Sequence, residues 1–154
     1  MIRLTRAAAA SLLALSLAAP SLACMPPPEA QDFRKHPAEA YTGERKAVDF
    51  GSHPVAAKLG ESDRERVRKA VEAGPNFAGA YRIVYAPCGE KCNAILVVSL
   101  ATGKILRLPV ADNAYANFRP NSKFLIVRAP GGEGVRFFVF DGREFKATES
   151  QSES

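Results

Sequence analysis

The chain has 154 residues, with 21 basic and 16 acidic side chains and a formal net charge of +5 at pH 7. This length suits one domain rather than several. So mild an excess of positive charge gives no electrostatic footprint for nucleic acid, and nucleic acid is therefore excluded as an expected partner.

Residues 1–23 have the layout of a secretory signal peptide. Arg3 and Arg6 precede a largely apolar run of 13 residues, and the small-residue pattern Ser-Leu-Ala ends at Ala23. The run is too short for a bilayer, which needs about 20 residues. Cutting after Ala23 leaves 131 of the 154 residues, with 19 basic against 16 acidic side chains. We therefore expect an exported, periplasmic protein in a compartment that allows disulfides.

Cys24 follows the expected cleavage site directly, and two predictions stay open for it. It holds the place of the lipid-acceptor cysteine of a bacterial lipoprotein, which would anchor the protein to the outer membrane. However, Ser21 stands where lipoprotein signals usually have Leu. The alternative is an ordinary cut with a cysteine that happens to lie beside it. Contact with a membrane is expected only through this lipid.

Residues 24–45 are expected to be an irregular leading arm or tether, because they contain four prolines and show no sustained period. Residues 46–149 are expected to form a single disulfide-stapled domain. Its first strand is expected at residues 46–50. The polar residues 150–154 are expected to fray.

One amphipathic helix of about three turns is predicted before Gly74 and Pro75, which would stop it. Ser62 and Glu65 have the spacing of a capping box at its start. Its apolar positions share one face, and its basic positions, expected to be solvated, cover the rest. These are Val67, Ala70 and Val71 on the first face, and Arg64, Arg66, Arg68 and Lys69 on the second.

The period changes to that of β-strands after this helix. Strands are expected over residues 80–87, 93–100, 105–110, 122–130, 135–140 and 143–148. The second is apolar on both faces, as a central strand should be, and Asp141 with Gly142 predicts a hairpin turn. The predicted fold class is α+β, mainly β: an antiparallel meander of five or six strands with one short amphipathic helix.

Cys88 and Cys92 lie at the tip of the hairpin between the first two of those strands. A thioredoxin-type couple has two intervening residues, whereas three stand here, and the flanks are strands. A zinc site needs two further ligands, and the only histidines, His36 and His53, lie in the leading region. A catalytic thiol would need a histidine partner. A disulfide needs only the oxidising compartment, so we expect the two cysteines to be joined.

Four strings within residues 74–127 carry a family resemblance: GPNFAGAYRIV, CGEKC, ATGKI and FRPNSKFLIV. They resemble a largely uncharacterised family of small exported bacterial proteins with a Gly-Pro-Asn-Phe-Ala-Gly start, a paired-cysteine tip and a Thr-Gly-Lys turn. The resemblance covers roughly half of the expected mature chain and implies no activity. Within the first string, Gly79 is expected to permit close packing and Phe77 to fill the core.

Residues 112–121 are expected to form a loop and are the best candidate for binding a partner. They combine Tyr115, Phe118 and Arg119, residue types that are found at interface hot spots, with Asp112. The alternative is an ordinary loop whose aromatic side chains lie under the edge of the sheet. No catalytic residues, metal ligands or cofactor are predicted.

The function expected from the sequence is that of a non-enzymatic envelope protein that binds a protein partner of unknown identity. An immunity or inhibitor-like role is one form of this hypothesis. One alternative is a small envelope-modifying hydrolase that uses Asp112 with Arg119 or His53. The other is a metal-binding module, which would require free thiols at Cys88 and Cys92.

Overall fold

The computed structural model describes residues 28–132 and 134–149. The expected signal peptide, Cys24 and the tail from residue 150 lie outside the described residues. The described strands are β1 (Tyr81–Gly89), β2 (Cys92–Ser99), β3 (Ile105–Arg107), β4 (Tyr115–Phe118), β5 (Phe124–Arg128), β6 (Val135–Phe140) and β7 (Phe145–Thr148). The helical segments are α1 (Pro28–Lys35), η1 (Phe50–Ser52), α2 (Pro54–Ala57), α3 (Glu61–Glu72) and η2 (Pro130–Gly132). No helix among these residues is long and apolar enough to cross a bilayer.

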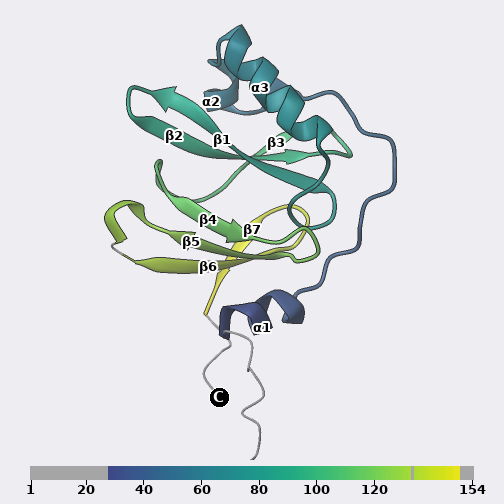
Figure 1. Ribbon diagram of the computed structural model, residues 1–154, viewed down its shortest axis with the longest axis vertical. Coiled ribbons are helices and arrows are strands. Elements are labelled where there is room, and N and C mark those ends of the chain that lie inside the picture. Colours follow the sequence, from purple (N-terminus) through teal and green to yellow (C-terminus); the bar gives the residue numbers. More distant parts are fainter. Residues whose placement is uncertain (1–27, 133, 150–154) are drawn as a thin grey trace, which may run out of the picture.

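The strands form two antiparallel sheets that lie face to face between layers of helix (Figure 1). The first sheet has the order β1-β2-β3 and the second the order β4-β5-β6-β7. Helices α2 and α3 cover the outer face of the first sheet, and α1 covers that of the second. The expected mainly β, antiparallel fold is confirmed. The single meander is wrong, because the chain leaves the first sheet after β3 and begins a second sheet at β4.

The main hydrophobic core lies between the two sheets. It joins Ile83 and Val97 of the first sheet to Leu125 and Phe138 of the second. The prediction for the second strand is confirmed: β2 is the central strand of its sheet and is buried on both faces from residue 94 onward. The core role expected for Phe77 is also confirmed, since its side chain is fully buried.

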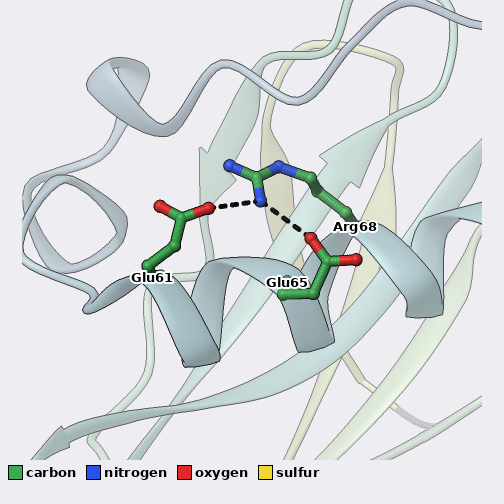
Figure 2. A network of polar contacts seen from close by, with 3 residues as sticks. All are labelled: Glu61, Glu65 and Arg68. Atoms are coloured by element: carbon green, nitrogen blue, oxygen red, sulfur yellow. Dashed lines mark hydrogen bonds and ion pairs between the residues drawn. The ribbon is translucent and has the colours of Figure 1, made fainter.

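Helix α3 confirms the predicted amphipathic helix but not its capping box. The helix begins two residues earlier than the box requires, with Gly60 instead of Ser62 as N-cap and no side-chain cap. Figure 2 shows what Glu65 does instead: Arg68 Nη1 bridges Glu61 Oε1 at 2.7 Å and Glu65 Oε2 at 2.9 Å. The hydrogen bond from Arg68 also lowers the pKa of Glu61. Glu65, the side chain that the capping box would use, is therefore paired with Arg68 instead.

The leading arm is not irregular as expected, because it contains α1. Phe33 of this helix is only 3% exposed and packs edge-on against Phe124 of β5, with ring centroids 5.4 Å apart. The ring of His36 stacks on Phe124 from the end of the same helix, at 5.6 Å. The start of the arm is thus part of the domain and closes the outer face of the second sheet.

Residues 37–49, here called the strap, run from α1 to the helices on the other side of the molecule (Figure 1). Four backbone amides of the strap donate to carbonyl oxygens of the domain: Ala38 to Asn121 (2.9 Å), Tyr41 to Gly79 (3.0 Å), Lys46 to Leu100 (2.9 Å) and Asp49 to Gly103 (2.8 Å). The strand expected at residues 46–50 is replaced by one isolated bridge between Asp49 and Lys104. The strap therefore runs past connections at the strand ends of both sheets without adding a full strand to either sheet.

Two glycines make room for the strap. Gly79 has φ +73°, and a Cβ there would lie 1.7 Å from the carbonyl oxygen of Glu39. Gly103 has φ +74°, and a Cβ there would lie 1.9 Å from the carbonyl oxygen of Ala47. The close packing expected for Gly79 is confirmed, and the same requirement explains the glycine of the Thr-Gly-Lys turn.

Asn76 closes part of the free edge of β1. Its Oδ1 accepts a hydrogen bond from the amide of Ile83 at 2.7 Å, and its Nδ2 donates to the carbonyl of the same residue at 3.0 Å. A side-chain amide thus offers the donor and acceptor that a neighbouring strand would supply. This gives the asparagine of the Gly-Pro-Asn-Phe-Ala-Gly string a structural role.

We predict that Gly79→Ala and Gly103→Ala each lower the free energy of unfolding by about 3 kcal/mol or more. Left-handed backbone strain and overpacking against a carbonyl both contribute. Gly132→Ala is the matched control, because Gly132 has φ +79° and nothing within 4 Å of its added Cβ. The control substitution should lower the free energy of unfolding by only about 1–2 kcal/mol. Equal losses for all three variants in urea unfolding would contradict the role assigned to the strap.

A second prediction concerns His53, which is buried and accepts a hydrogen bond from the amide of Val55 at the start of α2 (3.2 Å). Burial, followed by the positive charge of Arg107, lowers the pKa of His53 below its ordinary value of 6.5. As the pH falls, the unfolded chain therefore binds the proton first. The stability linked to His53 is fully present above pH about 6.5 and is lost below it.

The thermal unfolding midpoint should accordingly fall between pH about 7.5 and about 5.5. His53→Asn should reduce this fall, because asparagine keeps a capping oxygen but does not titrate. An unchanged pH dependence in the variant would show that other groups cause the fall.

Candidate functional site

The β1–β2 hairpin ends in the Cys88–Cys92 disulfide, with the two Cα atoms 5.1 Å apart. The pairing register shifts between Pro87 and Gly89, and Gly89 then pairs with Cys92. This irregularity brings both cysteines to the tip. The disulfide predicted from the sequence is confirmed.

Asn113 fastens the chain before β4 to this tip. Its Oδ1 accepts a hydrogen bond from the amide of Asn93 at 2.8 Å, and its Nδ2 donates to the carbonyl of Lys91 at 3.0 Å. Its own amide donates to the carbonyl of Asn93 at 2.7 Å. Asn113 has φ +60°, a backbone conformation that asparagine tolerates better than most residues. Three bonds from one residue therefore fix the loop on the hairpin.

Two tyrosines stand beside this contact. Tyr85 of β1 is 46% exposed, and its hydroxyl accepts a hydrogen bond from the amide of Ala116 on β4 at 2.9 Å. Tyr115 is 69% exposed. An open hollow of about 360 Å³ is lined by five residues, which we call the hairpin-tip surface: Tyr85, Asn93, Asn113, Ala114 and Tyr115. This surface spans both sheets, since Tyr85 belongs to the first and Tyr115 to the second.

The four residues predicted to bind a partner do not share one surface. Asp112 and Tyr115 lie at the hairpin-tip end, where the carboxylate of Asp112 is within 4.8 Å of both cysteine sulfurs. Phe118 is half-buried against Phe77, with ring centroids 6.5 Å apart. The guanidinium of Arg119 lies 4.9 Å from the ring centre of Phe33, on α1.

These residues are separated because four of the residues expected to form a loop over 112–121 form strand β4 instead. The expected loop is therefore wrong for residues 115–118. Along a strand the residues advance by about 3.3 Å each, so Tyr115 and Arg119 are roughly 13 Å apart. Successive side chains also point to opposite faces, which sends Phe118 towards the core and leaves Tyr115 exposed.

The residues considered from the sequence for a hydrolase site also lie in different parts of the molecule. Asp112 lies at the hairpin tip and Arg119 lies against α1. His53 caps α2 on the outer side of the first sheet.

Sequence reasoning missed Tyr85, Asn93 and Asn113. Tyr85 was one aromatic residue in an alternating strand, and nothing in the sequence indicated that its hydroxyl meets β4. Asn113 did carry a signal, because asparagine next to aspartate is common where a loop needs a positive φ. Asn93 contributes only backbone atoms to the contact, so its residue type gave no indication.

Neither a family model nor a curated protein nor a solved structure matches this chain.

We predict that Asn113→Gly lowers the free energy of unfolding by about 1–2 kcal/mol, because two hydrogen bonds of about 0.5–1.5 kcal/mol each are lost. Glycine keeps the positive φ, so the variant isolates the side chain. Amide exchange of Asn93 should become faster, since its acceptor is gone. Asn117→Ala, at an exposed position of β4, is the control and should leave that exchange unchanged. Unaltered exchange in Asn113→Gly would contradict the proposed fastening.

Proposed function

We propose that this chain is a non-enzymatic exported protein whose hairpin-tip surface binds a protein partner in the bacterial envelope. The observation that carries the proposal is the pair of exposed tyrosines, Tyr85 and Tyr115, on either side of an open hollow. Tyrosine is enriched at binding hot spots because it offers a large amphipathic contact with few rotatable bonds.

Rigidity of the same surface supports this proposal. The disulfide holds the hairpin tip, Asn113 fixes the neighbouring loop to it, and the Tyr85 hydroxyl ties β1 to β4. A surface that is ordered before binding loses little conformational entropy when a partner arrives. An inhibitor-like or immunity role is the form of this function that best suits a small rigid domain.

Export is supported by residues 1–23 and by the disulfide, which forms and persists in oxidising compartments. We place the mature protein in the periplasm, with lipid on Cys24 as its anchored form at the outer membrane. Because α1 begins at Pro28, four residues after Cys24, the tether to that lipid is at most about 14 Å long. The anchored form therefore carries α1 next to the membrane.

The test is to place a photoreactive amino acid at position 115 in the cell that makes the protein. We expect a crosslink to one envelope protein, carried by chains whose intact mass shows that residues 1–23 have been removed. Lys69, which is exposed on α3, is the control position and should not give that adduct.

With the crosslinked protein in hand, Tyr115→Ala should weaken its binding by about tenfold or more, as truncation of a hot spot does. Lys69→Ala should leave the affinity unchanged. The proposal fails if position 115 gives no adduct or gives the same adducts as position 69.

A further inference from the structure

Three side chains of metal-ligand type meet beside the hairpin tip: Cys88, Cys92 and Asp112. The two sulfurs and a carboxylate oxygen all lie within 4.8 Å of one another. The cysteines are partly exposed and Asp112 is exposed, so the group can be reached from solvent. It is the one such group of three found within residues 28–132 and 134–149.

Neighbouring residues hold this group together. Asp112 directly precedes Asn113, whose side chain bonds to the backbone of Lys91 and Asn93 on either side of Cys92. The carboxylate is therefore brought to the hairpin by a fixed loop, about 20 residues further along the chain. Metal sites need such support, because ligands that are held in place bind more tightly than ligands that are free to move away.

We propose that reduction of the Cys88–Cys92 disulfide converts the hairpin tip into a site for a divalent cation of zinc type, bound by both thiolates and by Asp112. Two thiolates with one carboxylate form a borderline-soft set that suits Zn²⁺ and leaves a fourth position for water. This site goes beyond the partner-binding role proposed above, and its test does not depend on that role.

The reductant is a dithiol. Its two thiols give two electrons and two protons to the disulfide, the S–S bond breaks, and the dithiol itself becomes a disulfide. Cys88 and Cys92 are then thiols, and each loses its proton when the cation binds. The disulfide and the metal site are thus exclusive states of the same two sulfurs.

Only a small rearrangement is needed. With Zn–S distances of about 2.3 Å and a tetrahedral angle, the two sulfurs stand roughly 3.8 Å apart. The Cα atoms of Cys88 and Cys92 are 5.1 Å apart, so rotation of the side chains can open that distance. Asp112 is already beside them.

The site also alters its surroundings. Asn93 follows Cys92 and Asn113 follows Asp112, so the cation would lie at the border of the hairpin-tip surface. Reduction and metal binding together leave the net local charge unchanged, because two thiolates and one divalent cation sum to zero, but they replace a neutral disulfide with separated charges beside that surface.

The experiment uses the mature chain, residues 24–154, with Cys24→Ser so that the third cysteine does not take part. Zn²⁺ binding is measured without oxygen by competition with a coloured chelator, for the reduced and the oxidised protein. The reduced protein should bind one Zn²⁺ and the oxidised protein none. Co²⁺ in place of Zn²⁺ should give an absorption band from thiolate-to-metal charge transfer in the reduced protein only.

Asp112→Ala should weaken Zn²⁺ binding by the reduced protein by about tenfold or more, as expected for loss of a supporting or direct ligand. Glu90→Ala is the matched control: it removes a carboxylate of the same charge from the hairpin tip, but one outside the group of three, and the affinity should change by less than about twofold. The variants' circular dichroism is compared to establish that they are folded. Absence of Zn²⁺ binding by the reduced protein, or equal affinities for Asp112→Ala and the parent, would overturn the proposal.

Discussion

The close approach of the strap to two glycines is the constraint on which the rest of the structure depends. At Gly79 and Gly103 the carbonyl oxygens of Glu39 and Ala47 occupy the space where any other residue would carry its Cβ. Through these two contacts the strap connects α1, under the second sheet, to the helices above the first sheet. Each outer face is apolar and must be covered, so the strap is what allows one short chain to close both of them.

Elements with a clear period were predictable from the sequence, and elements defined by tertiary contacts were not. Helix α3 and the strands on both sides of the cysteines carry their own patterns, and the structure contains them. Strand β4 was expected to be loop, because its four residues are too few to show a period and its pairing with β5 is what defines it. Helix α1 was missed because prolines surround it and Phe33 is its one buried apolar side chain among the described residues.

In the candidate site, too, local features could be predicted and tertiary contacts could not. The disulfide followed from spacing and from the expected compartment, both of which are local properties of the chain. The position of Asp112 beside the sulfurs could not be predicted, because the zinc site was judged by the two histidines, whereas the fold brings a carboxylate to the cysteines from beyond β3. The hydrogen bond between Tyr85 and β4 joins residues 31 positions apart and was equally hidden.

The backbone contacts along the free edge of β1 limit how another protein can bind there. On this edge Tyr81 forms a β-bridge with Phe77, and the Asn76 side chain bonds to the backbone amide and carbonyl of Ile83. Pro87 lies on the same edge and has no amide proton to donate. Such an edge discourages a further strand from joining the sheet, and with it the edge-to-edge polymerisation that threatens open β structures in a crowded compartment. Recognition of a partner at this edge therefore depends on side chains. Side chains can discriminate between binding partners, whereas an exposed backbone cannot.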